Sequence, residues 1–192
     1  GMDLRVTHME AGDRQALRDF LNVSEQDVHS FGMVVAGYVD EATAGFLETI
    51  EQPWVMLGDV HSERTWHKLP VVTNDNFQGA HLAVQALLED GFDHVALVNF
   101  TGSPDWSWVR ECRAGAFAAL ESRPDVEFLL PSTPGLSRPE RLLREVEEWA
   151  GRVKPDNLGM VCRCYYSLHM GAALRHVLPG GCRVGITVFD VD

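Results

Sequence analysis

The chain has 192 residues, 45% of them hydrophobic and 23% charged, which is enough to bury the core of one or two compact lobes. Its 28 acidic and 16 basic side chains give a net charge of −12, which argues against a nucleic-acid-binding segment. No apolar run approaches the ~18 residues of a membrane-spanning helix, and no apolar leader opens the chain. We therefore expect a cytoplasmic protein with no membrane contact.

The first third of the chain alternates short apolar runs with amphipathic stretches. Strands are expected at residues 4–8, 33–36 and 54–57. A helix starting near Asp13 would place Ala16, Leu17, Phe20 and Leu21 on one face. Asp40 can cap a second helix that carries Ala44, Leu47 and Ile50 and ends before Pro53. A polar stretch at residues 59–68 then interrupts the pattern.

The alternation resumes at Val71. Asp75 and Gln78 have the spacing of a capping box, and Gly91 fits the left-handed end of the helix that they start. The inward residues of that helix are predicted to be Ala80, Ala83, Val84, Leu87 and Leu88. Further strands are expected at 95–98, 126–130, 158–162 and 184–189, with helices at 107–120, 137–151 and 167–178. This alternation predicts an α/β protein with parallel sheets.

The chain lacks the sequence signatures of the common catalytic sites. It has no G-x-G-x-x-G, Walker or G-x-S-x-G motif, and its four cysteines at 112, 162, 164 and 182 form no C-x-x-C pair. Asp59, His61, Glu63 and His67 could bind a metal, but a solvated loop explains their irregular spacing better. We predict a protein that is not an enzyme and uses no cofactor or metal.

Five segments resemble LacI/GalR transcriptional regulators, in the order of that family. They are QPWVML at 52–57, TNDNFQGA at 73–80 leading into the strand at 95–98, RAGAFAAL at 113–120, MGAA at 170–173 and VGITVFD at 184–190. Phe92 stands where the family has a histidine. Each motif is weak alone, but the five together cover most of residues 33–190.

The resemblance implies the effector-binding part of such a regulator. Its fold would be two Rossmann-like lobes of the periplasmic-binding-protein type, with a partial first lobe at 1–72 and a second lobe at 73–192. Compared with the family, we expect the chain to lack the DNA-binding head, the start of lobe one and the C-terminal crossover. The implied ligand is a small sugar or polyol in an interlobe cleft. The implied assembly is a homodimer, to which Leu168, Ala172 and His176 contribute, and DNA would be bound only through the absent head.

The candidate ligand residues follow the carboxyl ends of the predicted strands, where ligands bind in doubly wound sheets. Asp190 matches the family's ligand-holding aspartate and could accept two hydrogen bonds from sugar hydroxyls. Trp106 and Trp108 lie in the loop that covers the ligand in the family, where an indole can stack on a sugar. Trp108 could equally be the first core residue of its helix.

Other candidates are less distinctive or depart from the family. Tyr165 and Tyr166 replace an Asn-Asp pair, and Asp75 either contacts the ligand or only caps its helix. Tyr38 follows another predicted strand, with less to distinguish it.

Two charged positions of the family are also changed. Its sugar-clamping arginine falls on Cys112, flanked by Arg110 and Arg113, and its first-lobe aspartate falls on Gly58. We expect a pocket more aromatic and less charged than a typical sugar site.

Two alternatives stay open. A periplasmic-type sugar-binding protein would have the same fold but a secretion signal. A doubly wound enzyme would need catalytic motifs that the sequence does not contain.

Overall fold

The computed structural model describes residues 15, 16, 19, 32–51, 53–61, 69–98, 107–131, 139–162 and 167–188. The chain splits into two compact units, and the main division lies between Asn74 and Asp75. Both units are α/β, and every strand pairing in them is parallel. The parallel α/β class expected from the sequence is confirmed.

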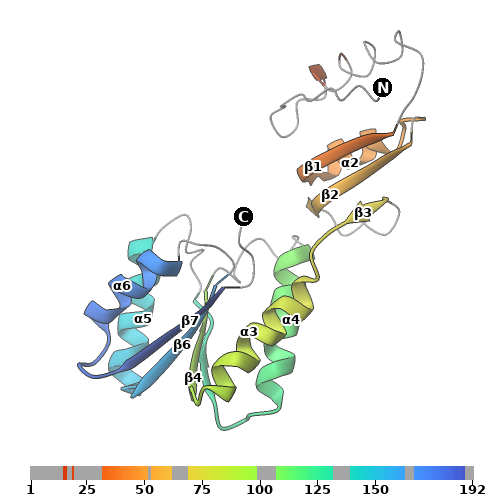
Figure 1. Cartoon of the computed structure of the whole chain (residues 1–192). Helices are drawn as coiled ribbons and strands as arrows, with labels where there is room; N and C mark the ends of the chain where they lie inside the picture. The colour runs from red at the N-terminus through yellow and green to blue at the C-terminus, as the bar shows by residue number, and fades with distance from the viewer. Residues whose placement is uncertain are drawn as a thin grey trace, which may run out of the picture. The chain divides into compact units, whose positions relative to one another are not determined.

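The first unit holds a three-stranded sheet in the order β1-β2-β3 with helix α2 beside it (Figure 1). Its elements are β1 (Met33–Asp40), α2 (Glu41–Leu47), β2 (Trp54–His61) and β3 (Val71–Val72). Asp40 caps α2 as predicted, because its Oδ1 accepts the N–H of Thr43 at 2.7 Å. The core of this unit consists of Val39, Ala44, Leu47, Met56 and Leu69. Ile50 follows the helix rather than belonging to it and packs against the edge of that core.

Strands β1 and β2 are longer than the sequence pattern predicted. They pair residue by residue up to Asp40 and His61, so the start of the expected polar interruption is strand. The sequence pattern stopped at Gly37 and Gly58, because glycine interrupts a run of strand-forming residues. In the structure these two glycines are register partners with φ of 120° and 136°, and the strands continue past them. A Cβ at Gly58 would lie 2.1 Å from the Gly37 carbonyl oxygen. The close approach of the two backbones therefore requires glycine at position 58.

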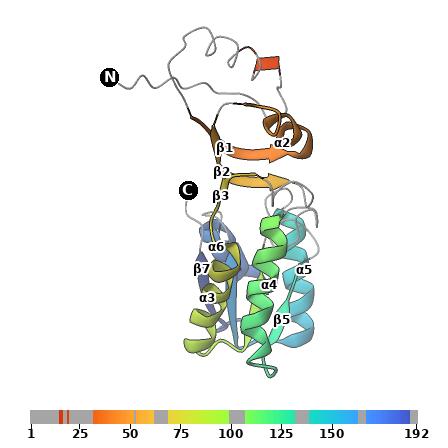
Figure 2. The ribbon, with the colours of Figure 1, turned by 90° about the vertical axis from the view of Figure 1, so that its right-hand side faces the viewer.

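The second unit is a four-stranded sheet in the order β5-β4-β6-β7, with helices on both faces (Figures 1 and 2). Helices α3 and α4 cover one face, and α5 and α6 cover the other (Figure 1). The elements are α3 (Asn76–Glu89), β4 (His94–Leu97), α4 (Ser107–Glu121), β5 (Glu127–Leu129), α5 (Pro139–Val153), β6 (Asn157–Cys162), α6 (Ser167–Val177) and β7 (Arg183–Val188). Each lies within a few residues of its predicted position.

Helix α3 agrees best with its sequence pattern. The five predicted inward residues are all buried, together with Asn76. The helix ends at Glu89, and Gly91, two residues further on, has the left-handed conformation expected after the helix, with φ of 78°.

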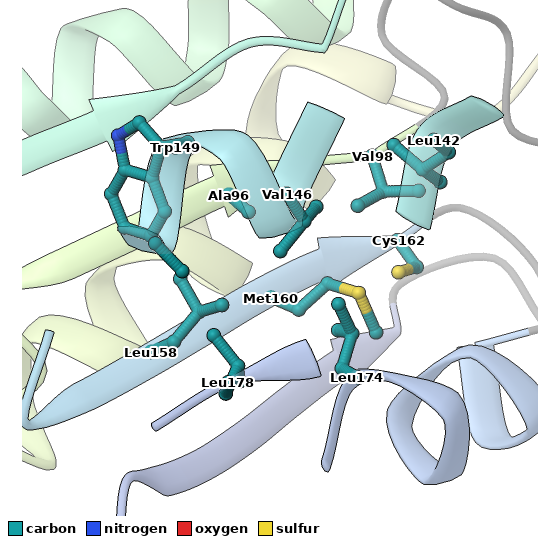
Figure 3. Packing of buried hydrophobic residues seen from close by; sticks show 11 residues of the cluster. Ala96, Val98, Leu142, Val146, Trp149, Leu158, Met160, Cys162, Leu174 and Leu178 are labelled. Atoms are coloured by element: carbon teal, nitrogen blue, oxygen red, sulfur yellow. The ribbon is translucent and has the colours of Figure 1, made fainter. Parts of the chain in front are cut away.

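The main core of the second unit lies between the sheet and helices α5 and α6 (Figure 3). Leu158 and Met160 of β6 are fully buried and face Val146, Trp149 and Leu174 from the two helices (Figure 3). Because β6 is buried on both faces, it forms the continuous apolar run that is typical of a central parallel strand.

The expected strand at 4–8 lies outside the described residues. Of the expected helix near Asp13, only Gln15, Ala16 and Asp19 are described, and all three are helical. Within the helices that the structure describes, none has both the length and the apolar character needed to cross a membrane.

Candidate functional site

The candidate ligand site is the carboxyl edge of the second unit's sheet. Strands β4, β6 and β7 run in parallel, with Leu97 beside Val161 and Cys162 beside Val188. The segments that follow these three strands therefore leave from the same edge. Trp106, Tyr165, Tyr166 and Asp190 belong to those segments and lie outside the described residues, so their role in ligand binding stays a prediction.

Trp108 is described, in the first turn of α4. It is 9% exposed, and the neighbouring Ser107 is 4% exposed. This burial agrees with the interpretation of Trp108 as the first core residue of its helix. A contact between its indole and a ligand stays a prediction.

Asp75 begins α3 at the same edge. Its Oδ1 accepts the N–H of Gln78 at 2.8 Å, and its side chain is exposed. Capping accounts for one carboxylate oxygen, and a ligand contact through the other stays a prediction. In the first unit, Tyr38 lies in β1 beside Asp59 of β2, close to the carboxyl ends of both strands.

The position of the family's clamping arginine is occupied by a buried thiol. Cys112 is 1% exposed and is not in a disulfide. The guanidinium of Arg113 lies 5.9 Å from the ring centroid of Phe117, one turn further from the start of α4. Neither residue supplies a cation directed at the carboxyl edge.

Sequence reasoning missed a polar contact between α3 and α4. Asn76 is only 2% exposed, and its Nδ2 donates to Glu111 Oε2 at 3.2 Å. The two helices touch nearby, because a Cβ at Gly115 would lie 2.0 Å from the carbonyl oxygen of Phe77. A sequence signal existed: Glu111 falls on the apolar stripe of α4 that Trp108 and Gly115 define at three- and four-residue intervals.

The opposite, amino edge of the sheet contains a structural cluster. The guanidinium of Arg183 lies 4.1 Å from the ring centroid of Phe92 and donates to the Asp90 carbonyl at 2.8 Å. Phe92 is 5% exposed, and its ring would lie 2.4 Å from a Cβ at Gly185. The residue that departs from the family's histidine is thus a core residue at the edge remote from the candidate ligand site.

Among the described residues, no group of three or more His, Cys, Asp or Glu side chains could hold a metal ion. The loop at 62–68, which carries Glu63 and His67, lies outside them.

No family model matches the sequence, and no curated protein matches it. Solved structures do match. The chain superposes on a probable maltose operon transcriptional repressor from Staphylococcus aureus with a TM-score of 0.64 at 13% identity, covering 95% of this chain and 64% of that one. For a dimeric lac repressor the TM-score is 0.54 at 19% identity, with coverage of 93% and 63%. A periplasmic solute-binding protein from Actinobacillus succinogenes with bound D-allose gives a TM-score of 0.59 at 18% identity, with coverage of 89% and 63%.

These likenesses define the class of fold. The chain has the periplasmic-binding-protein-like fold that LacI-type repressors and periplasmic solute-binding proteins share. It spans less than two thirds of the length of each of these three proteins.

Proposed function

We propose that this chain is the ligand-sensing domain of a LacI-type transcriptional regulator and that it binds a small, neutral, carbohydrate-like effector. The observation that carries the proposal is the shared fold, which covers 93% of this chain in the comparison with the lac repressor. The five motifs of that family, in its order, favour a regulator. In this proposal the domain performs no chemistry.

The ligand would bind at the carboxyl edge of the second unit's sheet. Asp190 would accept hydrogen bonds from hydroxyl groups, while Trp106, Tyr165 and Tyr166 would supply aromatic faces for stacking. Asp75, Tyr38 and Trp108 are secondary candidates. The buried Cys112 and the orientation of Arg113 support a preference for uncharged ligands, because neither gives a phosphate or carboxylate the guanidinium partner that the family has at position 112.

A ligand can act as an effector if it binds one conformation of the protein better than another. In the full-length regulator we propose that this difference changes how a homodimer presents its DNA-binding heads. Ala172 and His176, two of the three residues expected at the dimer contact, are exposed on α6. The chain alone should give no shift of random duplex DNA in a gel at low salt, because its net charge is −12.

The second candidate is a periplasmic-type sugar-binding protein, which the match to the D-allose-binding protein favours. The two functions share fold and ligand class but differ in what precedes the domain in the gene. A coding stretch for a helix-turn-helix would support the regulator, and one for a secretion signal would support the carrier.

The test is a thermal-shift screen of the protein with D-allose, D-xylose, glycerol and glucose 6-phosphate. A ligand at 100 times its Kd should stabilise the folded state by about 2.7 kcal/mol. We expect stabilisation by a neutral sugar and none by the phosphate. A response to glucose 6-phosphate alone would contradict the proposed pocket.

Calorimetry on single-residue variants then tests which side chains contact the ligand. Trp106→Ala should weaken sugar binding about tenfold or more, because stacking is lost, and Trp106→Phe, which keeps a ring, should retain most of the affinity. Asp190→Asn should weaken binding less for a ligand that donates one hydrogen bond than for one that donates two. Indifference to loss of the Trp106 ring would remove this residue from the site.

A further inference from the structure

Glu111 is a charged residue on the apolar stripe of α4. The stripe also contains Trp108, Cys112 and Gly115, which follow one another at three- and four-residue intervals. Trp108 and Cys112 are 9% and 1% exposed, and Glu111 itself is half-buried. Removing a carboxylate from water is costly unless hydrogen bonds or a cation compensate for the loss.

Asn76 provides part of that compensation. It is 2% exposed, and its Nδ2 donates to Oε2 of Glu111 at 3.2 Å. Among the interactions of the described residues, this is the single hydrogen bond that Glu111 accepts, and no ion pair there involves it. Since Asn76 is the first residue of α3, the positive end of that helix dipole also lies nearby and favours the ionised carboxylate.

The topology places this pair at the candidate ligand edge. Helix α4 follows β4 and runs back toward the start of β5, so it begins at the carboxyl ends of the strands. Helix α3 ends just before β4 and therefore begins at the same edge (Figures 1 and 2). Glu111 is four residues into α4, roughly 6 Å along the helix axis from its start.

We propose that Glu111 is a ligand-recognition residue, which Asn76 positions. In this arrangement Oε2 is held by Asn76, and Oε1 accepts a hydrogen bond from a hydroxyl or ammonium group of the bound molecule. The inference rests on the proposed function and extends its ligand class from neutral sugars to amino sugars, because a carboxylate also accepts a hydrogen bond from an ammonium group. An acidic ligand is disfavoured twice, by the carboxylate of Glu111 and by the absence of a clamping arginine at position 112.

The test is calorimetry with D-allose and D-glucosamine on the wild-type protein and on Glu111→Gln. The glutamine carbonyl can still accept from Asn76, so the melting temperature should change little. Hydrogen bonds to a charged acceptor are roughly twice as strong as neutral ones, so the Kd for D-allose should rise about tenfold. The rise should be larger for D-glucosamine, which carries a positive charge.

Two further variants separate recognition from packing. Asn76→Ala removes the positioning contact and should weaken sugar binding and lower the melting temperature together. Arg183→Ala removes the stacking on Phe92 at the opposite edge of the sheet; it should lower the melting temperature while leaving the Kd unchanged. Equal affinities of the wild type and Glu111→Gln would overturn this inference alone. A wild-type protein that binds neither sugar would overturn the proposed function and this inference with it.

Discussion

The two sheets of the molecule differ in how much of their surface is covered. In the second unit, helices pack on both faces, and five of the six residues of β6 are buried. In the first unit, α2 covers one face, and the other face exposes Val34, Leu57 and Val72 at 62%, 44% and 58%. Parallel sheets are usually covered on both sides, so the first sheet is the exception within the part of the chain that the structure describes.

The difference is informative because both sheets follow the same local rules. Each has parallel strands of apolar residues, and each helix whose cap is described starts at an aspartate. The two sheets differ in how many of their faces are covered by helices among the described residues. We therefore expect the second unit to be the more stable of the two and to unfold independently of damage to the first.

The largest expected effect comes from two methionines that are both 0% exposed, Met160 in the second unit and Met56 in the first. Substituting a buried methionine by alanine costs about 2–5 kcal/mol. Met160→Ala should lower the midpoint temperature of the main unfolding transition. Met56→Ala should increase amide hydrogen exchange in β1 and β2 and leave the amides of α3 and β4 protected. Exchange measured by mass spectrometry distinguishes these results. Loss of protection in both units on Met56→Ala would contradict the comparison.

The next effect tests the contact between α3 and α4. A Cβ at Gly115 would lie 2.0 Å from the backbone of Phe77, so Gly115→Ala must push the helices apart, at a cost of about 1–3 kcal/mol. Gly151 of α5 is the matched control, because nothing lies within 4 Å of a Cβ there. Gly151→Ala should raise the stability by up to about 1 kcal/mol through helix propensity. Urea unfolding of both variants is the measurement, and equal midpoints would refute the assigned contact.

Much of the second unit could be predicted from its sequence, because its signals are local. The cap at Asp75, the buried face of α3 and the turn at Gly91 all depend on residues close together in the chain. The extension of β2 to His61 could not be predicted in this way. It depends on the pairing of Gly37 with Gly58, two residues whose contact is visible only once the strands are side by side.

In the candidate site, too, some features could be predicted from the sequence and others could not. The strand ends that lead to Asp190 and Trp106 follow from the order of the elements, and the capping role of Asp75 follows from its spacing to Gln78. The contact of Asn76 with Glu111 joins positions 35 residues apart and needed the packing of two helices. The position of Glu111 on the apolar stripe of α4 indicated that a partner must offset the cost of burying its charge. The sequence did not indicate that this partner is Asn76.

A third prediction uses matched valine-to-threonine substitutions. Val34→Thr and Val72→Thr add a hydroxyl to the exposed face of the first sheet, so each should change the free energy of unfolding by no more than about 0.5 kcal/mol. Val95 of β4 is 0% exposed, and Val95→Thr should cost about 1–3 kcal/mol because the hydroxyl is buried. The two exposed changes should also reduce binding of a hydrophobic dye. A large destabilisation by Val34→Thr or Val72→Thr would mean that this face is covered in solution.

The smallest expected effect concerns an exposed ion pair in the second unit. Arg123 Nη2 lies 2.7 Å from Asp125 Oδ2, and the hydrogen bond from this guanidinium lowers the pKa of Asp125 below its usual value. A carboxyl whose pKa is lower in the folded state stabilises the protein above its unfolded pKa of about 4 and loses that contribution as the pH falls through the folded value. Since both groups are exposed, the contribution is small and should fade in about 1 M salt. The check is an NMR titration of the Asp125 carboxyl carbon, in which Arg123→Gln should raise the pKa toward the usual value. An identical titration curve in the variant and the wild type would show that the pair does not persist in solution.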